Sequence, residues 1–296
     1  MFPVNNYYPM KFVLILICQS FLFIASAQQV LEDNYINDCK GKVKECTETS
    51  YSRTYGSNIQ DTAVSIKSFD ENGRVNEFRS SIPGVPTKLD RYELSYSKSG
   101  QLREIRNFYH DGNYSGRLVF DSDKQGNIIE QTEYASNFGR LPKKIIKYKY
   151  DNNNRLIEAH KHTGDPIVNN NMGKLEDDYY EYDKKGFPVK TTAKINDRNL
   201  NLTGGWIYEF ENDTSGKLLV KYFIAKENTR VKREANTYYE TGLLREKFVY
   251  MEAFKWHYRY EYEYDQNGNW TKRIEHASEP NNKETDKTTI RKIIYY

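Results

Sequence analysis

Hydrophobic and polar side chains alternate along most of this chain. Every second residue from Tyr258 to Tyr264 is a tyrosine, and the residues between them are charged. The stretches 92–96 and 146–150 follow the same pattern. Because successive side chains of a strand point to opposite faces, this alternation predicts half-buried strands with aromatic rings on one face and charges on the other.

A recurring corner ends each predicted strand, as in FDENGRV at 69–75 and YDQNGNW at 264–270. An Asp at the first turn position bonds its own backbone, and a Gly three residues later takes the left-handed conformation of a bulged hairpin. Asn tolerates that conformation best among the other residues, which explains Asn154. The residues that we expect at these corners are Asp70, Gly73, Gly100, Gly126, Asp151, Asn154, Asp183, Gly186, Gly216, Gly242, Asp265 and Gly268.

The corners recur every 26 to 32 residues, in eight copies. The connections at the other end of each hairpin vary in length and sequence, and such variable loops commonly carry recognition. We therefore expect an all-β fold, an antiparallel repeat meander of about eight hairpins over residues 59–296. A flat sheet of that width is unfavourable, so we expect a curled sheet or a β-solenoid-like coil. A closed barrel is the alternative that the sequence does not decide.

The N-terminal segment has the features of an export signal. A lysine precedes a long apolar run, and the segment ends in Ala25-Ser26-Ala27. This pattern predicts a signal peptide over residues 1–27, cleaved near Ala27, and a secreted or periplasmic product. Translation from Met1 or from Met10 agrees equally well with this signal. A spanning helix and a lipid anchor at Cys18 are the weaker alternatives.

Two cysteines, Cys39 and Cys46, remain after cleavage. In an oxidising compartment we expect them to form a disulfide, worth roughly 2–3 kcal/mol, within an N-terminal cap over residues 28–58. Two free thiols or half of a metal site are the alternatives. Cleavage leaves 43 basic and 41 acidic side chains. Such a balance gives no footprint for nucleic acid.

The corner sequences, among them FDENGRV, YDNNNRL, YDKKGFP and YDQNGNW, resemble the tyrosine-aspartate (YD, or Rhs-type) repeat. The resemblance covers roughly residues 60–296. It implies a spiralling β-sheet in a secreted shell or a cell-surface protein with a binding role.

Candidate chemistry is sparse. His160 and His162 share a strand face, and we expect a solvated pair rather than a metal site. The acidic run from Glu176 to Asp178 is expected in a loop. The periodic acids Glu77, Glu104, Glu130, Glu158 and Glu246 are expected to pair with Lys and Arg across strands. The sequence contains no nucleophile elbow, phosphate loop or dinucleotide motif, so we expect no enzyme activity, cofactor or metal.

Two binding functions fit these features. In the first, Trp206, Trp256 and Tyr258 form an aromatic platform for a glycan or a protein ligand. In the second, the chain is a structural or protein-interaction accessory of a toxin or surface assembly. An outer-membrane barrel is the third alternative, but strands such as 103–108 place charges where lipid would lie, so we expect no stable membrane insertion.

Overall fold

The computed structural model describes residues 39–53, 60–82, 85–136, 141–163, 173–197, 202–225, 228–251, 254–278 and 284–296. The predicted signal peptide and the first part of the predicted cap lie outside these residues. Within this part of the chain, no helix is long and apolar enough to cross a membrane.

The described chain is a succession of antiparallel strands. They are β1 (Val43–Arg53), β2 (Gln60–Phe69), β3 (Val75–Ile82), β4 (Val85–Tyr96), β5 (Leu102–Phe108), β6 (Tyr114–Ser122), β7 (Ile128–Ala135), β8 (Lys144–Tyr150), β9 (Leu156–Thr163), β10 (Gly173–Tyr182), β11 (Pro188–Asp197), β12 (Leu202–Asn212), β13 (Leu218–Ile224), β14 (Arg230–Tyr238), β15 (Leu244–Tyr250), β16 (Lys255–Tyr264), β17 (Trp270–Ser278) and β18 (Glu284–Tyr295). The predicted all-β meander is confirmed.

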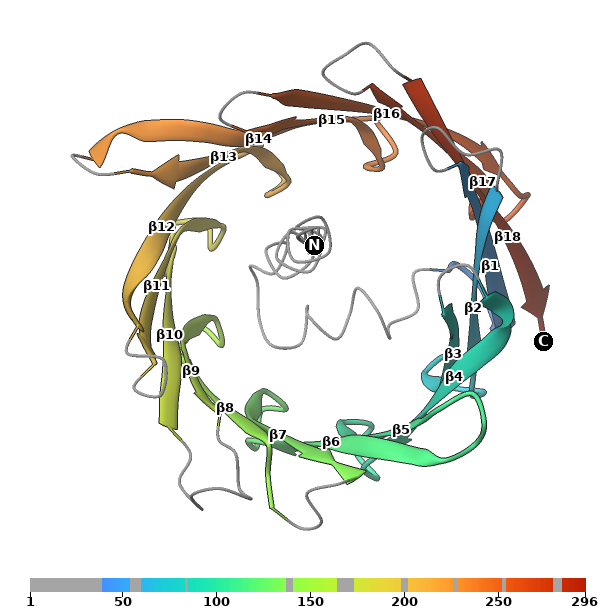
Figure 1. Ribbon diagram of the computed structural model, residues 1–296, viewed down its shortest axis with the longest axis horizontal. Coiled ribbons are helices and arrows are strands. Elements are labelled where there is room, and N and C mark those ends of the chain that lie inside the picture. Colours follow the sequence, from blue (N-terminus) through green and yellow to red (C-terminus); the bar gives the residue numbers. More distant parts are fainter. Residues whose placement is uncertain are drawn as a thin grey trace, which may run out of the picture.

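The meander closes on itself. Each strand pairs with the next, and β18 also pairs with β1, where Thr49 lies opposite Ile290. The result is a closed ring of 18 strands (Figure 1). The expectation of a curled sheet or solenoid is therefore wrong, because β1 supplies an edge with which the last strand can pair. Strand β1 belongs to this ring, although residues 43–53 were expected in a cap.

The predicted corners are confirmed. The seven predicted glycines and Asn154 all have positive φ. At the first corner, Gly73 N donates to Asp70 O at 2.9 Å and Asp70 N donates to Arg74 O at 2.8 Å. Asp70 Oδ1 accepts hydrogen bonds from the backbone amides of Asn72 and Arg74, both at 2.9 Å. A further turn of this kind, which we did not expect, lies at the opposite end of the barrel with Gly112 at φ +84°.

The tyrosine of the motif links one repeat to the preceding one. Its hydroxyl donates to the carbonyl of the first residue after the preceding corner, and we call this set of bonds the tyrosine ladder. The ladder bonds run from Tyr96 to Val75 O (2.6 Å), from Tyr150 to Ile128 O (2.9 Å), from Tyr182 to Leu156 O (2.7 Å) and from Tyr238 to Leu218 O (2.9 Å). The basic residue after the corner stacks on the same ring, as Arg74 does on Tyr96 at 4.9 Å. These contacts give the Tyr, Asp, Gly and Arg positions of the motif a shared structural role.

The aromatic face of the sheet turns toward the barrel axis. Figure 1 shows the tight turns bending inward, and these turns contact side chains of the aromatic face. Tyr295, for example, donates its hydroxyl to Asp265 Oδ2 in the last corner at 2.5 Å. Buried side chains of the core, such as Ile105 and Phe120, lie on this same face. The concave side of the barrel therefore holds the hydrophobic core, which is concentrated beneath the turns.

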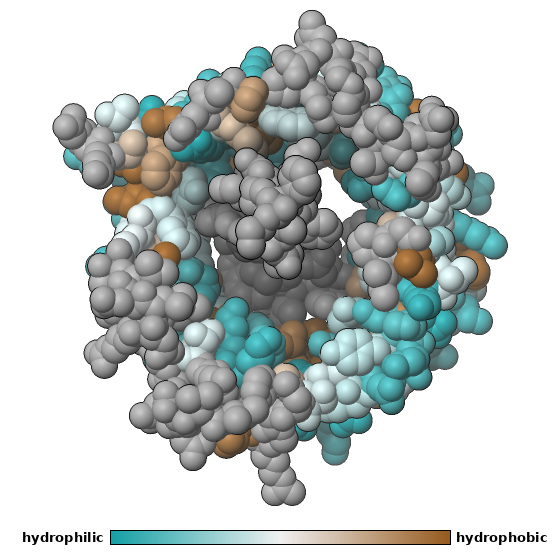
Figure 2. All heavy atoms as spheres, viewed as in Figure 1, coloured by the Kyte–Doolittle hydropathy of each residue, from teal (hydrophilic) through white to brown (hydrophobic). Residues whose placement is uncertain are grey.

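The outer face carries ion pairs around most of the ring. Glu104 pairs with Arg117 on the next strand at 3.3 Å, and Glu158 pairs with Lys149 at 2.8 Å. The predicted pairing of the periodic acids with Lys or Arg across strands is confirmed for four of them, Glu77, Glu104, Glu130 and Glu158. Glu246 instead lies 3.5 Å from His257 on the next strand. Figure 2 shows hydrophilic residues along much of the outer rim.

Side chains from both ends of the chain hold the closing seam together. Arg291 on β18 is 2% exposed, pairs with Glu48 on β1 at 2.5 Å and stacks on Trp270 at 3.5 Å. The hydroxyl of Tyr296 donates to Phe69 O at 2.7 Å. Contacts between residues this distant in sequence cost loop entropy, so the seam depends on the complete set of strands.

The predicted disulfide is not formed in this structure. No bond joins the sulfur atoms of Cys39 and Cys46, and both side chains are buried in the core beneath the seam. Arg291 Nη1 donates to Cys39 Sγ at 3.8 Å. The hydrogen bond to Cys39 and the burial of the thiol raise the pKa of Cys46 above its ordinary value.

Candidate functional site

The three aromatic residues predicted to bind a ligand all lie on the inner face. Trp206 on β12 is opposite Ala193, and Trp256 on β16 is opposite Val249. Tyr258 follows two residues later, and its ring stacks nearly parallel to that of Trp256, with centroids 6.4 Å apart and a 12° angle. All three side chains are half-buried. The structure thus places them on one wall but on two strands, with β13, β14 and β15 between them.

Further rings extend this surface. Tyr208 and Phe223 pair across β12 and β13, with ring centroids 5.8 Å apart. We use the term aromatic wall for Trp206, Tyr208, Phe223, Trp256 and Tyr258.

Charged and amide side chains lie within the aromatic wall. Lys247 pairs with Glu234 at 3.2 Å, and Asn236 Nδ2 donates to Glu234 Oε1 at 2.9 Å. The ammonium group of Lys221 lies 4.2 Å from the centroid of the Tyr208 ring. Because these groups are held by neighbours in a shielded wall, they offer donors and acceptors with little conformational freedom left to lose.

A second charged group on the inner face lies on β9 and β10. Lys161 pairs with Glu176 at 2.5 Å and with Asp178 at 2.8 Å. Burial raises the pKa of Asp178 to about 6, despite the opposing effect of Lys161. The expectation that the acidic run lies in a loop is wrong, because these residues continue the alternation of β10.

His160 lies on the outer face, where its ring nitrogens contact Asp177 Oδ1 at 2.6 Å and Glu158 Oε2 at 3.1 Å. His162 lies two residues further along β9. Among the described residues, no group of His, Cys, Asp and Glu is arranged to hold a metal ion.

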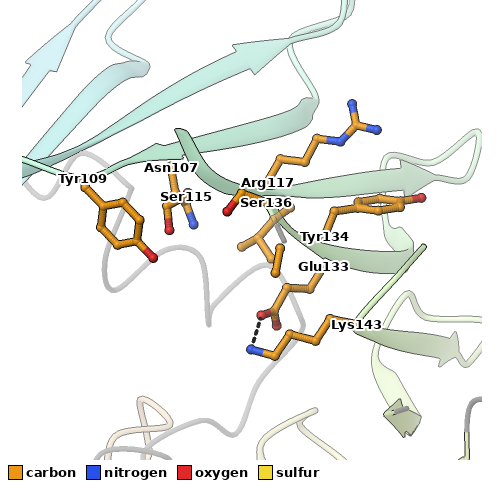
Figure 3. Close-up of a pocket in the computed structure, with 11 residues that line it drawn as sticks. Asn107, Tyr109, Ser115, Arg117, Glu133, Tyr134, Ser136 and Lys143 are labelled. Atoms are coloured by element: carbon orange, nitrogen blue, oxygen red, sulfur yellow. Dashed lines mark hydrogen bonds and ion pairs between the residues drawn. The ribbon is translucent and has the colours of Figure 1, made fainter. Parts of the chain in front are cut away.

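A polar pocket opens on the inner face at β5, β6 and β7, across the ring from the aromatic wall. Its volume is about 770 Å³. Figure 3 shows Glu133 and Lys143 approaching each other, with their ion pair at 3.1 Å, while Arg117 and Tyr134 extend away. We did not predict this pocket from the sequence. The available signal was Gly116, an isolated glycine inside an otherwise alternating strand.

No protein-family model matches the sequence, and no curated protein matches it. A comparison with solved structures finds three that are similar to parts of this chain. A porin-like protein from Bacteroides uniformis is 10% identical with a TM-score of 0.47, covering 85% of this chain and 98% of that one. The TcdB2-TccC3-TEV protein is 13% identical with a TM-score of 0.36, covering 78% of this chain and 14% of that one. A Bacteroides fragilis protein of unknown function is 12% identical with a TM-score of 0.24, covering 49% and 89%. At these TM-scores the similarities do not identify a family.

Proposed function

We propose that this chain is an exported, non-enzymatic binding protein that holds a glycan against the aromatic wall inside its barrel. The observation that carries the proposal is the shared inward orientation of Trp206, Trp256 and Tyr258, with the parallel rings of Trp256 and Tyr258. Large aromatic side chains provide rigid contact area at a small entropic cost, which suits the apolar face of a sugar ring.

The polar groups of the wall complement the rings. The Lys247–Glu234 pair places an ammonium and a carboxylate next to each other, 18% and 13% exposed. Sugar hydroxyls donate and accept hydrogen bonds, so they can bond both members of the pair at once. Aromatic side chains combined with a few fixed polar groups are the usual lining of small-molecule sites.

The resemblance to YD repeats belongs to the same proposal. The tyrosine ladder and the stacking of Arg74 on Tyr96 give the recurring residues a reason to recur, which supports a divergent YD repeat. In that case the chain acts as a binding module of the cell envelope. A protein partner held by the variable loops is the alternative occupant.

A membrane-spanning barrel is the second candidate, because the 18 strands close into a ring. The charged side chains of the outer face argue against a membrane-spanning barrel. Ion-paired residues such as Glu104, Lys147, Lys190 and Lys272 lie on that face, and a charge exposed to lipid near the midplane costs about 2–4 kcal/mol. We therefore favour a barrel that is surrounded by water.

A glycan array probed with the processed protein tests the main proposal. We expect binding that Trp256→Ala weakens at least tenfold and that Tyr250→Ala, an aromatic change on the outer face, leaves unchanged. Equal binding by Trp206→Ala, Trp256→Ala and the wild type would refute a role for the aromatic wall. Purification that requires detergent would instead favour the membrane-spanning barrel, and stable co-purification of one protein would favour the protein partner.

A further inference from the structure

We propose that the pocket on β5, β6 and β7 is a second binding site, which takes a neutral, hydroxyl-rich unit of a carbohydrate. This inference goes beyond the aromatic wall, because the pocket lies on a different part of the ring and has its own polar groups. Its lining includes Asn107, Tyr109, Ser115, Glu133 and Lys143.

A glycine lies at the centre of the pocket, where the backbones of β6 and β7 approach closely. Gly116 lies between Asn107 on β5 and Ala135 on β7, so three adjacent inner positions carry an amide, a hydrogen atom and a methyl group. A Cβ on Gly116 would overlap the carbonyl oxygen of Tyr134. The volume of the pocket, about 770 Å³, falls in the range of roughly 300–1,000 Å³ typical of small-molecule sites.

The amide of Asn107 is the polar group that the fold does not use. Its Oδ1 is shielded from solvent and has no hydrogen-bond partner among the described residues. Leaving a buried acceptor unpaired costs about 1–3 kcal/mol. A ligand hydroxyl that donates to this oxygen, after a small rotation of the side chain, would recover that cost.

The charges around the pocket select against ionic ligands. Glu133 and Lys143 pair with each other, and their side chains are 32% and 51% exposed. An anion would meet the carboxylate of Glu133, and a cation would meet the ammonium of Lys143. A neutral polyol can bond both groups without breaking the pair's charge balance.

An exposed ring completes the site. Tyr109, in the turn between β5 and β6, is 50% exposed and lines the pocket. Figure 3 shows its hydroxyl directed toward the same space as Asn107 and Ser115. The tyrosine ring provides a face on which a sugar can stack. The Ser115 hydroxyl can donate a hydrogen bond to the ligand and accept one from it.

Calorimetry with the neutral and sulfated oligosaccharides that score highest on the glycan array tests the site. We expect Asn107→Leu and Glu133→Gln each to weaken binding of the neutral probe at least tenfold. Arg106→Gln, on the outer face of the strand that carries Asn107, is the matched control and should bind as the wild type does. Asn107→Leu should keep the wild-type urea midpoint, because it removes an unpaired acceptor rather than a bond.

The outcomes separate the two sites. Loss of binding in Asn107→Leu and Glu133→Gln with normal binding in Trp256→Ala supports the pocket and refutes the aromatic wall. The reverse pattern overturns the pocket and leaves the aromatic wall in place. Preference for the sulfated probe, or no effect of Asn107→Leu and Glu133→Gln, also overturns the pocket.

Discussion

Removal of single hydroxyl groups from the tyrosine ladder tests the account of the repeat. Tyr96→Phe and Tyr150→Phe each delete one bond to a backbone carbonyl, at 2.6 and 2.9 Å, and keep the ring. A neutral hydrogen bond contributes about 1 kcal/mol net, and the carbonyl left behind loses its partner. We therefore expect each change to destabilise the barrel by about 1–2 kcal/mol. Because β4 and β8 are four strands apart, the double variant should lose the sum.

Tyr264 provides a matched control. It occupies the same motif position before Asp265, but it is 44% exposed and makes no hydrogen bond through its hydroxyl within the described residues. The urea midpoint should therefore fall in Tyr96→Phe and Tyr150→Phe and stay unchanged in Tyr264→Phe. Equal shifts in all three variants would refute the ladder, since a general effect of losing a hydroxyl would then explain the result.

The dependence of stability on pH above about 10 gives a second test of the same hydrogen bonds. Burial raises the pKa of Tyr96 and of Tyr150 from 10.0 to about 12. A folded pKa above the unfolded one means that this stability is complete below pH 10 and is lost as the pH rises through about 12. The difference in midpoint between the wild type and each Phe variant should therefore shrink over that interval. A difference that stays constant would contradict the assignment.

Three further outcomes follow from the structure. Because burial raises the folded pKa of Asp178 from 3.8 to about 6, the wild type should lose stability relative to Asp178→Asn as the pH rises from about 4 to 7, by up to about 3 kcal/mol, and a pH-independent gap in urea midpoint would exclude this group. Gly100→Ala puts a side chain at φ +87° and should lower the free energy of unfolding by about 1–2 kcal/mol. Gly204→Ala, with nothing within 4 Å of its Cβ, should leave it unchanged, and equal shifts of the urea midpoint in the two variants would contradict this account. Iodoacetamide followed by mass spectrometry should label neither Cys39 nor Cys46 in the folded protein and both after denaturation, and protection that persists in denaturant until a reductant is added would mean that the predicted disulfide forms instead.

One candidate site could be predicted from local sequence patterns, and the other depends on how neighbouring strands pair. The sequence singled out Trp206, Trp256 and Tyr258 as rings on alternating strands, and the structure places all three on the inner face. It did not reveal the pocket around Gly116, because that pocket arises from three residues on adjacent strands. The acidic residues of β10 were misplaced because their neighbours read as a loop, whereas pairing with β9 extends the strand.

The sequence by itself determined the corners, the strands and the charge pairs of the outer face. Each of these depends on residues a few positions apart or on the nearest hairpin neighbour, so Asp70, Gly73 and Glu77 act within one repeat. Closure was decided only by the tertiary structure, in the pairing of Thr49 with Ile290. Whether those two edges meet depends on the accumulated twist and stagger of all 18 strands. The sequence of a single repeat does not determine that accumulated geometry.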